Sequence, residues 1–314
     1  MLPVIGVTMG DAAGVGAEVA VKAFAHEEIY RQCVPVLIGD VSAVQDAIEF
    51  TGLPLTVHKI EDPAQAKGVY GTIDIMDMQL LPKGSWEYKK VNVNCGEASF
   101  RYVEKGIHLA MEEKLHAVVT GPICKEAVNL AGHHYSGHTE IFADLTGAKR
   151  YAMMLTSQKL RVIHVSTHVS LREACDRAKK ERILEVVRLA DEAVKLLGIK
   201  QPRIAVAGLN PHCSEGGMFG SEEAEQIVPA VQQAVQEGIS AEGPIPPDTV
   251  FVKAMGGAYD IVVAMYHDQG HIPLKLSGFQ MEPKTGNFTS LSGVNITVGL
   301  PIIRTSVDLS LIHI

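Results

Sequence analysis

Short apolar runs that alternate with helical patterns constrain the fold of this chain more than any other feature. The runs at residues 160–165 and 203–207 carry Val and Ile in the manner of buried parallel strands. Residues 97–114 and 180–197 instead repeat apolar side chains at helical spacing. Because strands and helices alternate over nearly the whole length, the sequence predicts an α/β protein with a mostly parallel sheet.

The expected elements cover most of the chain. We expect strands at residues 3–8, 34–38, 72–76, 117–120, 151–155, 160–165, 203–207 and 260–265, and helices at 97–114, 180–197 and 224–236. Residues 243–249 predict a stiff loop that opens another helix, the helical patterning ends near Met255, and residues 287–292 predict a polar loop. With 314 residues and 46% hydrophobic content, the chain has room for two domains, and without a linker we expect a cleft to divide them.

Composition excludes several classes of function. A net charge of −8 and an aromatic content of 5% argue against a nucleic-acid surface. No stretch approaches the ~18–20 uninterrupted apolar residues that a membrane span needs. The five cysteines are odd in number and scattered, which is typical of reduced thiols, and the N-terminus lacks the basic segment of a signal peptide. We therefore expect a cytoplasmic protein that binds neither nucleic acid nor membranes.

Three histidines follow three of the expected strands. His168, His212 and His267 come just after the runs at residues 160–165, 203–209 and 260–265. In open α/β sheets the chemistry lies past the carboxyl ends of the strands. Three imidazoles at that edge could hold one divalent metal and leave positions open, as catalytic metal sites do. The alternative is three unrelated loop histidines among the 13 in the chain.

Two further segments place backbone amides at an expected helix start. Residues 10–18, GDAAGVGAE, form either a tight turn or an anion-binding loop, and they match neither the dinucleotide fingerprint nor a P-loop. His138 and Thr139 offer an imidazole, a hydroxyl and N–H groups suited to an oxyanion or phosphate, unless Thr139 is only an N-cap.

Residues 210–223 are too dense in polar groups and glycines for a plain connection. They place Cys213 beside His212, but no base at a fixed spacing supports Cys213 as a nucleophile. This segment therefore supports a binding role for His212 and not covalent catalysis by its neighbour.

The last third of the chain adds charged candidates. Asp268 is suited to orient a ligand or to act as a base. Lys275 is placed to meet a negative group, and residues 295–306 predict a strand that runs into Arg304, which is suited to bidentate binding of a carboxylate or phosphate. Each cation taken singly is more often a surface salt-bridge partner.

Taken together, these segments resemble the 4-hydroxythreonine-4-phosphate dehydrogenase (PdxA) family, NAD-dependent β-decarboxylating dehydrogenases of vitamin B6 synthesis. The matching pieces run in order from residue 10 to residue 308: GDAAGVGAE, TGPICKEA, SGHTE, STH, LNPHCSEGG, GPIPPDT, MYHDQGHIPLK and GVNITVGLPIIRTSVD.

The resemblance implies a fold and a site. It implies two α/β/α domains of the isocitrate/isopropylmalate dehydrogenase type, residues 1–125 plus 296–314 and residues 126–295, with an interdomain cleft. It also implies a homodimer with an active site shared across the interface. The implied ligands of a divalent metal are His168, His212 and the partner subunit's His267. The implied ligands of a small phosphorylated substrate are His138, Thr139, Lys275, Asn295 and Arg304.

The chain departs from the family pattern at several places. Ala12 and Ala17 stand where prolines are usual, and Cys213 and Ser214 where Ala-Gly is usual. After Asp308 the family continues with His-Gly-Thr-Ala and a last helix, whereas residues 309–314 here read LSLIHI, a foreign or truncated tail by comparison.

The spacing from Lys275 to Asn295 is longer than in the vitamin B6 enzymes. The extra stretch, residues 279–292, and the segment 133–139 are similar to a sister branch that oxidises D-threonate or D-erythronate 4-phosphate. The expected reaction is NAD-dependent oxidation (NADP being the other option) of the C3 hydroxyl with decarboxylation to dihydroxyacetone phosphate.

The expected base is Asp268, Asp248 or Lys125, and the expected metal is Zn, Co, Ni, Fe, Mn or Mg. The main alternative is 4-hydroxythreonine-4-phosphate dehydrogenase of pyridoxal phosphate synthesis. Two others are a metal hydrolase or aldolase that needs no NAD, and a binding protein that has lost catalysis.

Overall fold

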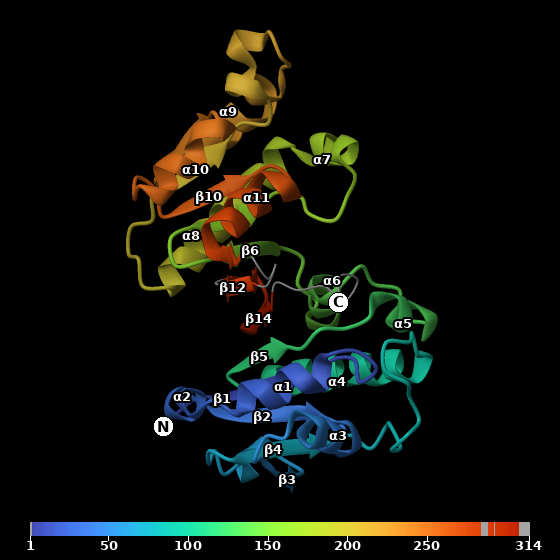
Figure 1. Cartoon of the computed structure of the whole chain (residues 1–314). Helices are drawn as coiled ribbons and strands as arrows, with labels where there is room; N and C mark the ends of the chain where they lie inside the picture. Colours follow the sequence, from blue (N-terminus) through green and yellow to red (C-terminus); the bar gives the residue numbers. More distant parts are fainter. Residues whose placement is uncertain (1, 284–287, 292, 308–314) are drawn as a thin grey trace. The chain divides into compact units, whose positions relative to one another are not determined.

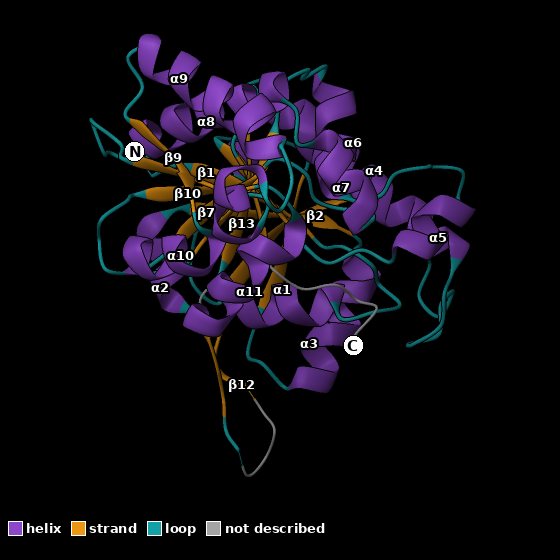
Figure 2. Cartoon of the chain, turned by 90° about the horizontal axis from the view of Figure 1, so that it is seen from above, coloured by secondary structure: helices purple, strands orange, loops and turns teal. Residues whose placement is uncertain are grey.

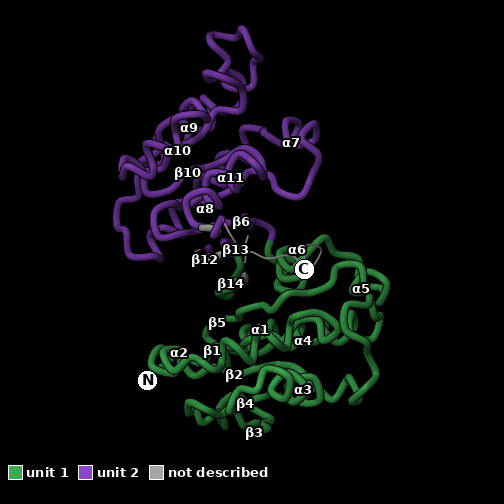
Figure 3. Tube along the Cα trace, viewed as in Figure 1, with its two compact units in different colours: residues 1–148, 300–314 green, residues 149–299 purple. Residues whose placement is uncertain are grey.

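The computed structural model describes residues 2–283, 288–291 and 293–307, which divide into two compact units (Figure 3). Unit 1 comprises residues 1–148 and 300–314, and unit 2 comprises residues 149–299. The tail at 309–314 and parts of the extra stretch, at 284–287 and 292, lie outside the described residues. Within the described part of the chain, no helix is long and apolar enough to cross a bilayer.

Unit 1 is a parallel sheet with helices. Its elements are β1 (Val4–Thr8), α1 (Gly16–Phe24), α2 (Glu27–Gln32), β2 (Val34–Gly39), α3 (Val41–Thr51), β3 (Thr56–Ile60), η1 (Pro63–Gln65), β4 (Thr72–Asp77), α4 (Val93–Met111), β5 (Ala117–Thr120), α5 (Lys125–Leu130), α6 (His138–Thr146) and β14 (Arg304–Val307). The strand order is β3-β4-β2-β1-β5-β14, and all neighbours are parallel (Figure 1).

Close packing of α4 organises the core of unit 1. A Cβ added at Gly106 would lie 3.3 Å from Val118 on β5 and 3.5 Å from Ile38 on β2, so the helix lies directly on the sheet. A Cβ at Gly96 would lie 2.2 Å from the carbonyl oxygen of Ala127 on α5. These two glycines therefore bring α4 onto the strands and bring α5, which begins with Lys125, against α4.

Unit 2 has a mixed sheet. Its elements are β6 (Ala152–Thr156), β7 (Arg161–His164), α7 (Leu171–Arg177), α8 (Lys180–Leu196), β8 (Ile204–Ala207), η2 (Pro211–Gly217), η3 (Glu223–Ile227), α9 (Val228–Gln236), β9 (Ala241–Ile245), α10 (Pro247–Met255), β10 (Ile261–Ala264), α11 (His267–Gly278), β11 (Phe279–Met281), β12 (Phe288–Leu291) and β13 (Val294–Val298). The strand order is β13-β6-β7-β10-β8-β9, antiparallel over the first three strands and parallel from β7 onward.

Successive residues of the central strands serve the two faces of this sheet. Ile163, Val206 and Val263 pack with α8 and α9 in one apolar cluster. Their neighbours Val162 and Val262 belong to a second cluster, with α10 and α11. The α/β fold with mostly parallel sheets that the sequence predicts is thus confirmed.

Several local expectations differ from the structure. Residues 243–245, predicted as part of a loop, belong to β9, and a helix, α11, follows the predicted end of helical patterning. The predicted strand that runs into Arg304 is two strands, β13 and β14. Part of the predicted loop 287–292 is β12, which pairs with β11 in an antiparallel hairpin that Figure 2 shows as an extended arm.

The boundaries between units differ from the predicted domain boundaries. Residues 126–148 belong to unit 1, because α5 and α6 pack against α4. Residues 296–299 belong to unit 2, because β13 pairs with β6. The sequence predicts the helix start at His138 and a strand from residue 295, but not the element against which each one packs.

Replacing Gly96 with Ala tests the crossing of α4 and α5. Ala is favoured over Gly by about 1 kcal/mol inside a helix, yet its Cβ would overlap the Ala127 carbonyl, and overpacking costs about 1–3 kcal/mol. We expect Gly96→Ala to lower the free energy of unfolding in urea. Gly106→Ala, whose Cβ would meet only side-chain atoms at 3.3 Å or more, is the matched control and should cost less. A more stable Gly96→Ala protein would contradict this packing.

Candidate active site

Three neighbouring strands of unit 2 bring the predicted metal-binding histidines to one edge of the sheet. β10 pairs in parallel with β7 on one side and with β8 on the other. His168 follows β7, His267 begins α11 after β10, and His212 lies in η2 after β8. All three histidines therefore follow the carboxyl ends of adjacent parallel strands, where α/β proteins place their reactive groups.

Four imidazoles form a row at this edge. The ring centroids of His168 and His267 are 5.9 Å apart. His271 stacks on His267 at 3.6 Å, with 12° between the ring planes, and His164 lies 4.7 Å from His271. Neither His164 nor His271 is among the residues predicted from the sequence. The four-residue spacing of His267 and His271, which places them on one helix face, is the signal that could have found the second.

Burial keeps the two inner imidazoles neutral at pH 7. His164 is fully buried, and burial lowers its pKa to about 4. Burial and the neighbouring His164 lower the pKa of His271 to about 2. Nε2 of His164 has no hydrogen-bond partner among the described residues, and a Cβ at Gly270 would lie 2.4 Å from it. The glycine of the YHDQGH segment therefore makes room for a buried imidazole.

The buried side chain of Gln269 ties the start of α11 to two strand ends. Its Oε1 accepts a hydrogen bond from the backbone N–H of Met265 at 2.7 Å, just after β10. Its Nε2 donates to the carbonyl oxygen of Gly208 at 2.8 Å, just after β8. The segment that carries His267 is thereby held to the segment that leads into His212.

η2 presents His212 on a strained turn. Residues 212–216 all have positive φ, a conformation that costs about 1–2 kcal/mol for each non-glycine residue. The buried carboxylate of Glu223 holds the turn, because it accepts from the backbone N–H groups of Leu209 and Asn210 at 2.8 and 2.6 Å and from the hydroxyl of Ser214. Burial acts to raise the pKa of Glu223, but these hydrogen bonds hold it below its ordinary value. Glu223 is thus a positioning residue.

The donor chemistry fits a divalent metal, although among the described residues no three His, Cys, Asp or Glu side chains are grouped as a metal site. Nδ1 of His212 lies 2.8 Å from Glu215, and Nδ1 of His267 lies 2.7 Å from Asp268. In both pairs the carboxylate engages Nδ1, which leaves Nε2 as the nitrogen that could bind a metal. Carboxylates orient metal-binding histidines in this way in other proteins.

Asp248 lies in the first turn of α10, close enough for its charge to affect the pKa of Cys213 in η2. Burial, then Glu223 and Asp248, raise the pKa of Cys213 to about 11. Cys213 is therefore a neutral thiol near pH 7 and a poor nucleophile.

Two predicted substrate ligands also lie in unit 2. Lys275 is in the last turn of α11, with its Nζ 5.8 Å from the ring centroid of Phe279. Asn295 lies on β13, opposite Leu155 of β6, and its buried Oδ1 has no hydrogen-bond partner in the described ranges. A buried amide oxygen of this kind can accept a hydrogen bond from a ligand hydroxyl or from water.

In unit 1, the predicted anion ligands lie around the start of α6. This helix begins at His138, and its N-cap, Gly137, makes no side-chain capping bond. Burial, then the charges of Arg304 and Lys125, hold the pKa of His138 well below its ordinary value. Nε2 of His138 is buried and, within the described residues, has no hydrogen-bond partner.

Arg304 supplies a buried positive charge to the same region. It is 2% exposed, its Nη2 donates to Thr120 Oγ1 at 2.9 Å, and its guanidinium lies 5.4 Å from the ring centroid of Phe142. Burial lowers its pKa to about 10, so it stays charged at pH 7. A guanidinium beside a helix N-terminus suits a phosphate. The structure thus brings His138, Thr139, Arg304 and Lys125 together.

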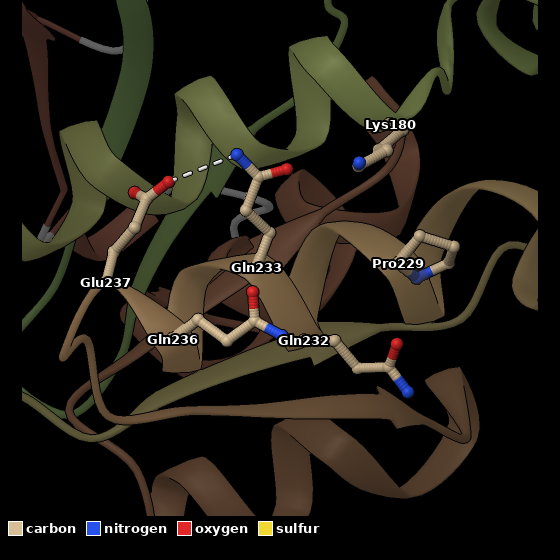
Figure 4. Close-up of a pocket in the computed structure, with 6 residues that line it drawn as sticks. All are labelled: Lys180, Pro229, Gln232, Gln233, Gln236 and Glu237. Atoms are coloured by element: carbon tan, nitrogen blue, oxygen red, sulfur yellow. Dashed lines mark hydrogen bonds between the residues drawn. The ribbon is translucent and has the colours of Figure 1, made fainter.

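A separate hollow on unit 2 contains none of the predicted site residues (Figure 4). It has a volume of about 380 Å³ and is lined by Lys180 of α8 and by residues of α9 and its end: Pro229, Gln232, Gln233, Gln236 and Glu237. Gln233 donates to Glu237 at 3.2 Å. The polar groups of its lining are three amides, one ammonium group and one carboxylate.

The fold agrees with comparisons to known proteins. The family model for the pyridoxal phosphate biosynthetic protein PdxA matches residues 31–310. The chain belongs to the PdxA family. D-threonate 4-phosphate dehydrogenase of Cupriavidus necator is 46% identical over 308 residues, which cover 98% of this chain and 89% of that protein.

Other PdxA-family relatives carry another name. The 4-hydroxythreonine-4-phosphate dehydrogenase of Desulforapulum autotrophicum is 44% identical, over 98% of this chain and 87% of that protein. The crystal structure of 4-hydroxythreonine-4-phosphate dehydrogenase from Klebsiella pneumoniae matches with a TM-score of 0.87 and 41% identity, over 98% of this chain and 91% of that one. The predicted family and the predicted dehydrogenase class are therefore confirmed.

The buried His164 of this PdxA-family chain predicts a pH dependence of stability. Its pKa is about 4 when folded and about 6.5 when unfolded, so only the unfolded state takes up this proton between those values. Stability should therefore fall as pH falls from about 6.5 to about 4. We expect His164→Leu to reduce the slope of unfolding free energy against pH near 5 by up to about 1.4 kcal/mol per unit. Urea melts from pH 4.5 to 7 with a chelator measure it, and an unchanged slope would contradict a neutral buried His164.

Proposed function

We propose that this PdxA-family enzyme oxidises the C3 hydroxyl of a four-carbon acid-sugar 4-phosphate, D-threonate or D-erythronate 4-phosphate, with a nicotinamide dinucleotide as the oxidant. The observation that carries the proposal is the clustering of His138, Thr139 and Arg304 at the start of α6, in a chain 46% identical to a D-threonate 4-phosphate dehydrogenase. The cluster would bind the phosphate, and Lys275 and Asn295 are the other proposed substrate ligands. Phosphate binding supplies energy that holds C3 in register for hydride transfer.

The choice of substrate rests on the stretch between two proposed ligands. Lys275 lies in α11 and Asn295 on β13, and the β11–β12 hairpin occupies the chain between them. Because both ends carry proposed substrate ligands, a longer connection changes the surroundings of the substrate. The second candidate, the 2-amino analogue 4-hydroxythreonine 4-phosphate, has the support of a relative with that name at 44% identity.

His168, His212 and His267 are the proposed holders of a divalent metal. The family resemblance implies that the partner subunit's His267 completes each site in a homodimer, whereas within one subunit His267 lies 5.9 Å from His168, ring centroid to ring centroid. When bound, the metal supplies Lewis acidity that lowers the pKa of the C3 hydroxyl. Glu215 and Asp268 hold the imidazoles of His212 and His267 by their Nδ1 atoms. Glu223 holds the turn from which His212 projects.

The proposed reaction is an oxidation followed by loss of carbon dioxide. The hydroxyl proton of C3 passes to a base, for which Asp268, Asp248 and Lys125 remain the candidates. The hydride of C3 passes to the nicotinamide, and the product is a 3-keto acid. The C1–C2 bond then breaks, carbon dioxide leaves, and C2 takes up a proton to give dihydroxyacetone phosphate.

Substrate preference gives a direct test. A site that hydrogen-bonds a C2 hydroxyl disfavours a C2 ammonium, because a buried charge without a partner costs several kcal/mol. We expect kcat/KM for D-threonate or D-erythronate 4-phosphate to exceed that for 4-hydroxythreonine 4-phosphate by at least about 100-fold, or about 2.7 kcal/mol. The absorbance of the reduced cofactor gives the rate with each of the three substrates, with NAD and with NADP. Equal or reversed values would assign the chain to the vitamin B6 reaction, and no reduced cofactor with any substrate would remove the proposal.

Removing His212 tests the metal assignment. The side chain is 64% exposed, so His212→Ala should keep the fold, which circular dichroism checks. We expect loss of stoichiometric Co²⁺ binding, seen as loss of its visible d–d absorption, and at least about a 100-fold loss of kcat/KM. Glu215→Gln should weaken Co²⁺ binding by about 10–100-fold, as loss of an outer-shell partner usually does. His108→Ala on the exposed surface of α4 is the control, and equal Co²⁺ binding by all variants would refute the assignment.

A further inference from the structure

Unit 1 contains a cavity outside the proposed metal and substrate sites. Of the segments predicted to carry function, only the loop at residues 10–18 lines it. Its volume is about 690 Å³, within the range of small-molecule and cofactor sites. It is bounded by the loop at residues 11–15 after β1, Phe50 near the end of α3, the segment 88–91, and Cys124 after β5. Its walls are mainly apolar, with charged side chains at Asp11, Glu18 and the lysines of the 88–91 segment.

The cavity lies where the strand order of the unit 1 sheet changes direction. β1 pairs with β2 on one side and with β5 on the other, and later strands extend both sides (Figure 1). The loops that leave β1 and β5 therefore diverge at a topological switch point, where open α/β sheets bind their ligands. The backbones of these two loops are in contact. The Asp11 N–H donates to the carbonyl oxygen of Pro122 at 2.9 Å, and Gly10, at φ +79°, leaves no room for a Cβ there.

The cavity combines an aromatic surface with groups that attract phosphate. Phe50 and Tyr88 form an edge-to-face pair with ring centroids 6.0 Å apart, and both are about half exposed. α1 begins beside the cavity at Gly16, and its N-cap, Val15, lines the cavity, so the positive end of the helix dipole lies next to it. Lys89 lines the same cavity and is anchored by its backbone N–H, which donates to Ala13 at 2.8 Å.

Two carboxylates limit how much negative charge the cavity accepts. Asp11 is buried and accepts a hydrogen bond from the backbone N–H of Ala13 at 2.8 Å. Glu18, in the first turn of α1, pairs with Lys22 at 2.5 Å. A carboxylate beside a ribose accepts hydrogen bonds from its hydroxyls and disfavours a phosphate at the 2′ position. The cavity therefore suits a nucleoside diphosphate without an extra phosphate.

We propose that this cavity binds the adenosine diphosphate half of the nicotinamide dinucleotide, with adenine against Phe50 and Tyr88 and the diphosphate near the start of α1 and Lys89. Glu18 faces the ribose hydroxyls and sets a preference for NAD over NADP. The assignment rests on the proposed function for the identity of the cofactor, but binding of adenosine diphosphate to the cavity can be measured without turnover.

The test uses ADP as a probe that lacks the nicotinamide. Titration calorimetry of the full chain gives Kd for ADP, and quenching of Trp86, the single tryptophan and close in sequence to Tyr88, gives Kd for NADH. We expect Phe50→Ala to weaken both by at least about tenfold, because stacking of a base on an aromatic ring contributes about 1–3 kcal/mol. KM for NAD should rise by a similar factor with kcat little changed.

Matched controls are present in the same unit. Tyr70 forms an edge-to-face pair with Tyr30 at 5.9 Å and is also half exposed, so Tyr70→Ala removes an equivalent aromatic pair elsewhere and should leave Kd for ADP unchanged. Glu18→Gln should lower the ratio of NAD to NADP affinity by at least about fivefold. Glu27→Gln, which breaks the corresponding four-residue ion pair with Arg31 on α2, should not change that ratio.

The outcomes separate this assignment from the proposed function. If Phe50→Ala bound ADP and NADH with the same Kd values as the parent protein, the cavity assignment would be overturned. The proposed reduction of NAD with D-threonate 4-phosphate would still stand. Absence of ADP binding to the parent protein would also overturn it. Loss of ADP binding in Phe50→Ala, in a protein that reduces no cofactor with any of the acid-sugar phosphates, would keep the nucleotide site and remove the proposed reaction.

Discussion

Parallel pairing of β7, β10 and β8 is the constraint on which the candidate metal region depends. Parallel strands all leave a sheet at the same edge, so segments distant in sequence emerge side by side. His168, His212 and His267 follow these three strands, and the side chain of Gln269 joins the ends of β10 and β8 by two hydrogen bonds. The strand pairing therefore fixes where each histidine lies at the edge of the sheet, and local contacts set the orientation of its ring.

Burial decides the protonation state of imidazoles in both units. His271 stacks on His267, and His164 lies beside His271. Desolvation keeps both neutral at pH 7, so they add bulk near a proposed metal ligand without adding charge. His138 is neutral for the same reason, although Arg304 and Lys125 also disfavour its protonated form. At the start of α6 the positive charge therefore resides on Arg304 and Lys125, while the neutral imidazole of His138 can donate or accept a hydrogen bond.

Periodicity in the sequence was sufficient for the strands and helices with regular apolar patterns and for the strand-end positions of the three histidines. It missed α11, because His267, Gly270 and Pro273 give that helix little amphipathic pattern. It missed β9, because Gly243 and Pro244 are poor strand formers. His164 was hidden as one polar residue within an apolar strand, and its relation to His271 depends on packing between β7 and α11, which no local pattern encodes.

The positions at which local rules fail share a physical cause. Residues 212–216 adopt left-handed backbone angles although only one of them is glycine. The buried Glu223 carboxylate offsets the cost, because it accepts from the Ser214 hydroxyl within the turn and from two backbone N–H groups just before it. Gly270 lies inside α11, where glycine costs about 1 kcal/mol, because the ring of His164 occupies the space of a side chain. In both places an unfavourable local conformation is held by tertiary contacts, and in both it determines the surroundings of a histidine. Strain of this kind persists only where the rest of the structure over-determines it, so the sheet and its helices must be stable enough to hold η2 and α11 in place.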